Sequence, residues 1–332
     1  MTQHREKSRS GFGVSAGMPN TDMRLPAALR NRAGWSRLFD AKRDKEPHLH
    51  QIEPTNHCIF ACIMCPRKKM TREVGYIDLG LFRRVINEVA AYGGPSRNKE
   101  IELFHFGESL FHPELHTMTA YASERDLKTV LSLNPPELAP DTTCRLLEAR
   151  PYKIILSQDG IGTESYREMR GDAAKLDRAL SAIDTLLAER QRLGVKTRLV
   201  IRMIRLNRNI EETERFEAFW QGRGLETEIR EFFPWGDPEM QELGPYRRYP
   251  TGMPCPFPWQ HLVVQRNGDV VPCCRDYDAT VKLGSVRDNS LTEIWNSDAY
   301  ETFRETHRTG RYGDNRTCEN CMKLYYTPEQ KP

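Results

Sequence analysis

Between residues 48 and 234, short apolar runs alternate with longer amphipathic stretches. In residues 79–93 the apolar side chains recur every three or four positions, which is the spacing of a helix with one buried face. The short runs predict strands at 48–55, 101–107, 128–134, 152–160, 196–206 and 226–234. The amphipathic stretches predict helices at 79–93, 113–126, 140–150, 174–194 and 210–224. Strands that alternate with helices in this way are typical of parallel βα units.

Residue types at the ends of these stretches sharpen the predicted helix boundaries. Asp141 or Thr142 is suited to the N-cap of the helix at 140–150, because its side-chain oxygen can accept a hydrogen bond from a free backbone N–H. Pro113 suits the first turn of its helix. Gly194 is expected to end the longest helix, since glycine tolerates the left-handed backbone conformation found there.

The pattern changes on either side of this region. Residues 1–24 form a polar stretch with no predicted structure, and a short helical lead-in follows. After residue 234 a stretch rich in proline and glycine precedes two short strands at 261–274, joined by the turn dipeptide Asn267-Gly268. A helix at 290–308 is predicted, with Ser290 as its N-cap. The sequence thus divides into three parts, 1–47, 48–234 and 235–332.

Composition narrows the class of protein. The 332 residues include 49 Lys and Arg against 46 Asp and Glu, and this balance gives no reason to expect a nucleic-acid partner. No apolar run is long enough to predict a membrane span, and the N-terminus lacks the apolar core of a signal peptide. Nine cysteines without an export signal indicate a cytoplasmic protein that uses its thiols for metal ligation.

Three cysteines, Cys58, Cys62 and Cys65, stand close together in the segment HCIFACIMCPRKKM. Thiolates at this spacing can bind one face of a 4Fe–4S cluster, and three ligands leave the fourth iron open to a substrate or cofactor. A C-x-x-C pair alone would also suit zinc or thioredoxin-like chemistry. The third cysteine, four residues upstream of the pair's first member, favours the cluster.

A second group of cysteines lies in the C-terminal part. Cys255, Cys273, Cys318 and Cys321 could together bind either zinc or a second 4Fe–4S cluster, and their spacing leaves both possibilities open. Two cysteines remain outside these groups. Cys144 is expected to be a buried structural thiol, and Cys274 follows a predicted ligand directly.

The first cysteine array resembles the cluster loop of the radical S-adenosylmethionine (SAM) superfamily, C-x3-C-x-φ-C, in which φ is usually aromatic. Met64 occupies the φ position here and would still give the adenine a polarizable contact. The resemblance implies a partial (β/α)6 TIM-like barrel, an α/β fold, with the cluster loop at the carboxyl ends of the strands. It also implies that the open iron chelates SAM, and that one electron then cleaves SAM to a 5′-deoxyadenosyl radical.

The C-terminal part resembles the SPASM/twitch extensions of radical SAM enzymes, small α+β units that hold auxiliary iron–sulfur clusters. The segments VVQRNGDVVPCC and CENC carry this resemblance. With four candidate ligands, one fully ligated auxiliary 4Fe–4S cluster is the better fit. This shorter arrangement is similar to the group of radical SAM enzymes of the 2-deoxy-scyllo-inosamine dehydrogenase type.

The resemblance also assigns candidate residues at the strand ends. In FHFGES, Gly107 would allow close backbone approach and Glu108 would accept hydrogen bonds from the SAM ammonium group. Further contacts with SAM are expected from the following residues: Phe60, Met64, Ser132, Asn134, Ser157 and Arg202.

Substrate chemistry is expected at the same mouth of the barrel. Arg202 and Arg205 lie three residues apart on one strand, so at most one of them should face the interior. Either could bind the SAM carboxylate or a substrate group. Glu231 could act as a base, and Cys274 could donate a hydrogen atom.

The predicted function is a radical SAM oxidoreductase of natural-product (antibiotic) biosynthesis that oxidises an alcohol of a sugar, aminocyclitol or nucleoside to a ketone. A closed auxiliary cluster has no free iron for a substrate, and its expected role is to accept an electron. An external one-electron reductant such as flavodoxin or ferredoxin is expected as a partner. The alternatives are a sugar epimerase, decarboxylase or dehydratase, an enzyme that modifies ribosomal peptides, and a zinc-binding scaffold without redox chemistry.

Overall fold

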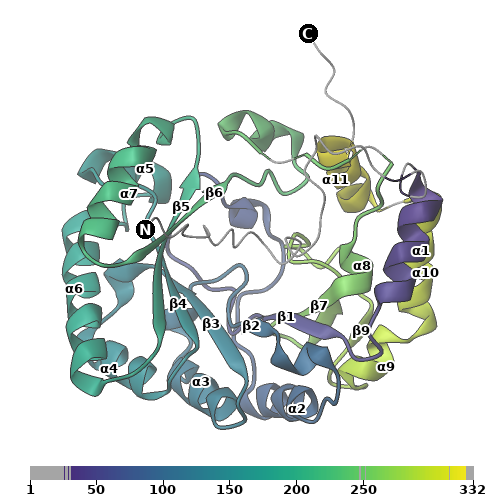
Figure 1. Cartoon of the computed structure of the whole chain (residues 1–332), viewed down its shortest axis with the longest axis horizontal. Coiled ribbons are helices and arrows are strands. Elements are labelled where there is room, and N and C mark those ends of the chain that lie inside the picture. The colour runs from purple at the N-terminus through teal and green to yellow at the C-terminus, as the bar shows by residue number, and fades with distance from the viewer. Residues whose placement is uncertain are drawn as a thin grey trace, which may run out of the picture.

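The computed structural model describes residue 26, residue 29 and residues 31–246, 248–250, 252–313 and 315–326. Its centre is one curved nine-stranded sheet in the order β6-β5-β4-β3-β2-β1-β7-β8-β9 (Figure 1). The strands are β1 His48–Ile52, β2 Glu100–Glu102, β3 Lys128–Leu133, β4 Lys153–Ser157, β5 Arg198–Arg205, β6 Glu226–Glu231, β7 His261–Val264, β8 Asp269–Val271 and β9 Gly284–Ser285. Strands β1 to β6 are parallel to their neighbours. The sheet has two edges, β6 and β9, so the barrel is open, as predicted.

Helices line the outside of the curved sheet (Figure 1). Those of the barrel are α2 Leu79–Ala90, α3 Leu115–Ser123, α4 Pro140–Glu148, α5 Thr163–Arg170, α6 Leu176–Leu193 and α7 Thr213–Gly222. The others are α1 Arg32–Lys42, α8 Phe257–Gln260, α9 Leu291–Trp295, α10 Asp298–Thr309 and α11 Arg316–Tyr326. Helix α1 lies within the predicted lead-in, whereas the polar stretch 1–24 lies outside the described residues.

The apolar stripe of α2 packs into the main core as its spacing predicts. Leu81, Phe82, Val85, Ile86 and Val89 are all buried there. The Asp78 side chain caps this helix by accepting a hydrogen bond from the backbone N–H of Leu81 at 2.9 Å. Gly194 ends α6 with a φ of 62°, the left-handed conformation expected of it.

Several helix boundaries differ from the sequence prediction. Neither Asp141 nor Thr142 caps α4: Ala139 is the N-cap and Pro140 takes the first helical position, where its missing N–H costs nothing. The helix predicted at 290–308 is two helices, since Ser290 caps α9 and Ser297 caps α10. Both caps accept backbone N–H groups, so each serine starts a helix of its own.

Three helices were not predicted: α5, α8 and α11. Helix α5 has only eight residues and α11 has eleven, and three of the eight residues in α5 are buried. So short an apolar pattern is hard to recognise in sequence. Helix α11 carries two of the predicted ligand cysteines, Cys318 and Cys321.

The hairpin of β7 and β8 joins the barrel sheet. Strand β7 runs parallel to β1, with His48 opposite His261 and Ile52 opposite Val264. Arg72 further ties the two parts together, because its guanidinium donates to both oxygens of the buried Glu53 at 2.8 Å and to the carbonyl of Tyr277 at 2.7 Å. Burial alone would raise the pKa of Glu53, but Arg72 and His105 hold it well below its usual range.

Within the described part of the chain, no helix combines the length and apolar character that a membrane crossing requires.

Candidate active site

The loop that carries the first three cysteines, residues 57–70 and called here the cluster loop, is held by the end of α5. The backbone N–H groups of Ala61 and Ile63 donate to the carbonyls of Arg170 and Met169, both at 3.1 Å. Gly171, with a φ of 85°, packs directly against Ala61. The unpredicted helix α5 is therefore what fixes the shape of the cluster loop.

The three cysteines of this loop form a buried sulfur-lined site. Burial raises the pKa of Cys58 to about 11 and that of Cys65 to about 12, and it raises the pKa of Cys62 as well. Such thiols become thiolate ligands only when a strongly cationic group binds them. Nowhere among the described residues do three His, Cys, Asp or Glu side chains converge closely enough to hold a single metal ion. The three thiols are the number of protein ligands that a 4Fe–4S cluster with one open iron requires.

Glu108 lies beside the cluster loop, where the sequence places it. It is 1% exposed and accepts hydrogen bonds from both the backbone N–H and the side-chain amide of Asn134. Burial raises the pKa of Glu108 to about 7. Its own N–H donates to the carbonyl of His57 at 2.8 Å, so the strand end and the loop are joined by backbone.

Gly107 allows this contact between backbone segments. A Cβ at Gly107 would lie 2.1 Å from the carbonyl oxygen of Thr55 and 2.9 Å from the Cα of Asn56. Glycine is needed because two backbone segments meet here. Its effect is to bring Glu108 next to the cluster loop.

Arg170, at the end of α5, is a functional candidate that sequence reasoning missed. Its guanidinium forms an ion pair with Asp159 at 2.6 Å and donates to the Asn134 side chain. Burial alone would lower the pKa of Arg170, but Asp159 and Cys62 raise it above its usual range, so the side chain stays charged. A permanent cation thus stands between the cluster loop and the ends of β3 and β4.

These side chains suit the amino acid end of SAM. Glu108 can accept from an ammonium group and Arg170 can donate to a carboxylate. The hydroxyl of Tyr166 is fully buried beside them and has no hydrogen-bond partner in the described part of the chain. A buried polar atom without a partner is costly, so a bound polar ligand is expected here.

Phe60 and Met64 are buried in apolar clusters beside the loop. Phe60 packs with Tyr166 and Leu176, whereas Met64 packs with Met169 and Phe232. A contact of either side chain with SAM stays a prediction.

The barrel interior carries a charged cluster, which we call the interior charge cluster: Glu102, Arg202, Glu228 and Arg230. Strand residues alternate between faces, and Val200 packs with Val130 and Ile155 apart from the helix-facing core. Arg202 shares the face of Val200. The hydroxyls of Ser132 and Ser157, 3.3 Å apart, lie on this same interior face, and Ser157 is in register with Arg202.

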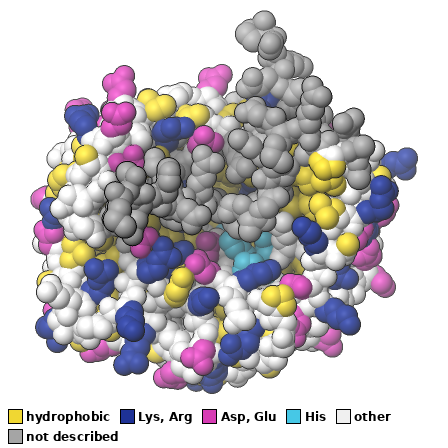
Figure 2. Space-filling view, viewed as in Figure 1, with side chains coloured by type: hydrophobic (Ala, Val, Ile, Leu, Met, Phe, Trp, Pro, Cys, Tyr) yellow, Lys and Arg dark blue, Asp and Glu magenta, His cyan; other side chains and the backbone are white. Residues whose placement is uncertain are grey.

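The charges in this cluster compensate one another. Glu228 forms ion pairs with Arg202 at 2.9 Å and with Arg230 at 2.6 Å. Burial and the neighbouring Arg230 lower the pKa of Arg202 to about 10. Glu102 accepts from the Gln51 side chain at 2.6 Å and lies 3.7 Å from His50, whose pKa is lowered by burial. In Figure 2, acidic, basic and histidine side chains gather near the middle of the visible face.

Arg205 and Glu231 lie on the other face of their strands. They form an ion pair with each other at 3.3 Å, and the Glu231 side chain is 47% exposed. The prediction that only one of Arg202 and Arg205 faces the interior is thus confirmed, and Arg202 is that one. The structure does not bring Arg205 or Glu231 into the barrel interior.

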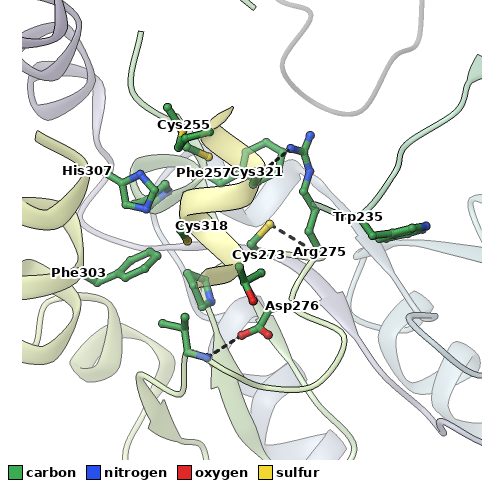
Figure 3. A pocket seen from close by; sticks show the side chains of 15 residues that line it. Trp235, Cys255, Phe257, Cys273, Arg275, Asp276, Phe303, His307, Cys318 and Cys321 are labelled. Atoms are coloured by element: carbon green, nitrogen blue, oxygen red, sulfur yellow. Dashed lines mark hydrogen bonds between the residues drawn. The ribbon is translucent and has the colours of Figure 1, made fainter. Parts of the chain in front are cut away.

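The second group of cysteines lines one cavity, which has about 510 Å³ of space including its open mouth (Figure 3). Cys255, Cys273, Cys318 and Cys321 reach it from the loop before α8, the end of the hairpin and helix α11. Burial raises the pKa of all four thiols, that of Cys255 to about 12. The four predicted ligands therefore line one sulfur-containing site that suits an auxiliary cluster.

The two remaining cysteines differ from the ligands. Cys274 is 6% exposed and packs within an apolar cluster, while its carbonyl oxygen lies 3.0 Å from the Nε2 of His105. Cys144 was expected to be buried. It is instead partly exposed on α4, 3.6 Å from a carboxylate oxygen of Glu148, because it lies off the buried face of that helix.

Trp235 links the two cysteine sites. Its indole N–H donates to the carbonyl of Met64, inside the cluster loop, at 2.7 Å. The same side chain lines the C-terminal cavity, and its ring lies 5.3 Å from that of Phe233. Its backbone has a φ of 56°, which is uncommon for a residue other than glycine.

The fold and the site define an enzyme that binds SAM beside an open iron–sulfur cluster and holds a second cluster nearby. Comparison with known proteins agrees: residues 52–216 match the sequence model of the radical SAM superfamily, and residues 255–322 match that of the SPASM iron–sulfur cluster-binding domain. The chain belongs to the radical SAM superfamily and carries a SPASM-type domain. Its cofactors are SAM, the 4Fe–4S cluster that binds SAM, and auxiliary iron–sulfur clusters of the kind that SPASM domains bind.

Relatives and solved structures agree with this assignment. The chain is 28% identical over 295 residues to the S-adenosyl-L-methionine-dependent 2-deoxy-scyllo-inosamine dehydrogenase of Niallia circulans, covering 87% of this chain and 98% of that protein. The crystal structure of BtrN in complex with AdoMet and 2-DOIA superposes with a TM-score of 0.58 at 18% identity, over 87% of this chain and 98% of that one. The crystal structure of Streptococcus suis SuiB bound to S-adenosylmethionine superposes with a TM-score of 0.62 at 15% identity, over 81% of this chain and 70% of that one. At these identities the two structures support the fold.

Proposed function

We propose that this enzyme oxidises a secondary alcohol of an amino-bearing cyclitol or sugar to a ketone. The observation that carries the proposal is the closed auxiliary site, in which four cysteines line one cavity. A cluster with four protein ligands keeps no iron for a substrate, so it is suited to electron transfer. An electron acceptor beside the barrel favours a net oxidation over a redox-neutral rearrangement.

The residues at the cluster loop bind and orient SAM in this proposal. Glu108 accepts hydrogen bonds from its ammonium group, and Arg170 donates to its carboxylate. Asn134 and Ser157 contact its remaining polar groups in this proposal. When bound, SAM and its reduced cluster supply a 5′-deoxyadenosyl radical that takes one hydrogen atom from the substrate.

The interior charge cluster binds the substrate. Paired carboxylates and guanidiniums offer acceptors and donors to the hydroxyl and ammonium groups of an aminocyclitol. Glu228 is held between two arginines, whereas the Glu102 carboxylate accepts from a neutral amide, so we assign the contact with the reacting hydroxyl to Glu102. The reaction balances: the carbinol carbon loses a hydrogen atom, the hydroxyl proton passes to Glu102 and one electron leaves for the auxiliary site.

The named activity of the Niallia circulans relative supports oxidation of an aminocyclitol alcohol. An epimerase would need a thiol beside the substrate, and the one candidate from sequence, Cys274, packs in an apolar cluster instead. The proposal includes a cytoplasmic setting and an external one-electron donor of the flavodoxin or ferredoxin class. A role in the biosynthesis of an antibiotic is the natural context for such a substrate.

The test starts from anaerobically reconstituted enzyme, which should hold about eight irons per chain if two four-iron clusters are present. A panel of aminocyclitols and aminosugars is then incubated with SAM and dithionite. We expect one ketone for each 5′-deoxyadenosine, and deuterium transfer from a labelled carbinol carbon into 5′-deoxyadenosine. An epimer formed with solvent deuterium at the reacting carbon, and no ketone, would overturn the proposal.

A further inference from the structure

Arg275 and His307 flank the auxiliary cysteines from opposite sides, and neither was singled out by the sequence. In the view of Figure 3 the labelled cysteines lie between the two side chains. Both residues line the cavity, and neither is a predicted ligand.

Arg275 makes two contacts with ligand sulfurs. Its guanidinium Nη1 donates to the Sγ of Cys321 at 3.2 Å, and its backbone N–H donates to the Sγ of Cys273 at 3.3 Å. The guanidinium also stacks over the ring of Phe233 at 3.6 Å, which fixes its position. A guanidinium stays protonated in proteins, so this buried side chain is a cation.

Among the residues that the structure describes, no carboxylate forms a hydrogen bond or ion pair with Arg275. The neighbouring Asp276 accepts instead from the backbone N–H groups of Thr280 and Val281 at 2.8 Å. The positive charge is therefore directed at the cysteines.

His307 approaches the cavity from α10. It is 1% exposed, and neither of its ring nitrogens has a hydrogen-bond partner among the residues that the structure describes. Its ring is held between those of Phe303, at 4.9 Å, and Tyr312, at 5.1 Å. A buried imidazole N–H without a partner is costly, so a ligand in the cavity is expected to accept from it.

We infer that Arg275 and His307 are positioning residues that raise the reduction potential of the auxiliary cluster. Each N–H donated to a sulfur, and the buried cation above all, stabilises the more negative, reduced state of an iron–sulfur cluster. The inference deepens the proposed function. It rests on that function only where it says why the potential is raised, namely so that the auxiliary cluster can accept an electron from the substrate.

The test is a redox titration of the full holoenzyme without substrate, followed by electron paramagnetic resonance. Adding SAM perturbs the signal of the SAM-binding cluster, so the unperturbed signal reports the auxiliary one. We expect Arg275→Met to lower the reduction potential of the auxiliary cluster by at least about 59 mV. For a one-electron couple this is a tenfold change in the oxidised-to-reduced ratio. The potential of Arg275→Lys should lie between those of Arg275→Met and wild type. His307→Phe should also lower the potential.

Lys323→Gln is the matched control, because this exposed cation lies on the same helix as Cys318 and Cys321 and pairs with Glu319. Its auxiliary potential should equal that of wild type. Unchanged potentials in both Arg275→Lys and His307→Phe would overturn the inference, even if Arg275→Met loses the cluster altogether.

A second readout separates this inference from the proposed function. Variants with a lowered auxiliary potential should still cleave SAM but form less ketone per 5′-deoxyadenosine. Lowered potentials in an enzyme whose wild type yields no ketone from any substrate would sink the proposed function and leave the role of Arg275 and His307 intact.

Discussion

At the scale of single residues, the protonation of Glu108 links the stability of the fold to pH. Its pKa is raised to about 7 by burial, so the folded protein holds a proton that the unfolded chain releases near pH 4.5. Between these two values the native state binds more protons than the unfolded state. Stability from this group is therefore present at low pH and is lost as pH rises toward 7.

Glu108→Gln should remove this loss of stability at higher pH. In cluster-free protein we expect the variant to gain roughly 2–3 kcal/mol over wild type at pH 8, and little at pH 4.5. Urea unfolding at both pH values measures the difference. The same gain at both pH values would contradict the raised pKa. In the loaded enzyme the variant should bind SAM more weakly, because an amide carries no charge to pair with its ammonium group.

Gly107 gives a second prediction at this scale. Gly107→Ala places a Cβ 2.1 Å from the Thr55 carbonyl, so the strand end must move away from the cluster loop. We expect a loss of about 2–4 kcal/mol in the free energy of unfolding, as for other overpacked sites, together with weaker SAM binding. Gly222→Ala is the control, since nothing lies within 4 Å of its Cβ and alanine favours helix. Equal stability of the two variants would rule out the tight backbone contact.

At the scale of elements, α5 determines the shape of the SAM site. Arg170→Met removes its charged donor while keeping much of the side-chain volume. SAM affinity of the reconstituted enzyme should fall about 10- to 100-fold, the value of one charge-assisted hydrogen bond, as measured by equilibrium binding. Arg167→Met, on the exposed side of the same helix, should bind SAM like wild type. Matching affinities in the two variants would exclude Arg170 from the SAM site.

What could be predicted from sequence also divides by element. The six barrel strands and both cysteine groups were predictable, because periodicity and ligand spacing are local properties of the chain. Arg170 was not, since α5 is short and its role depends on where its end meets the cluster loop. The contact of Gly107 with Thr55 could not be predicted either, because the two residues are distant in sequence.

At the scale of the whole molecule, the two cysteine sites should be separable by mutation. Cys318→Ser removes one ligand of the auxiliary site, so iron should fall from about eight to about four per chain. SAM cleavage with dithionite should persist while ketone formation is lost. Cys144→Ser, at a partly exposed position away from both sites, should keep the full iron content. Iron and ketone both retained in Cys318→Ser would show that Cys318 is not a ligand.

The strand β7 that runs beside β1 affects how this chain could be re-engineered. Because β7 covers the edge that β1 would otherwise expose, the SPASM-type domain cannot be exchanged as an independent unit. A graft from another family member must supply a strand that pairs with His48–Ile52 in the same register, as well as an acceptor for Arg72. A chimera joined at the end of β6 to a domain without such a strand is not expected to fold.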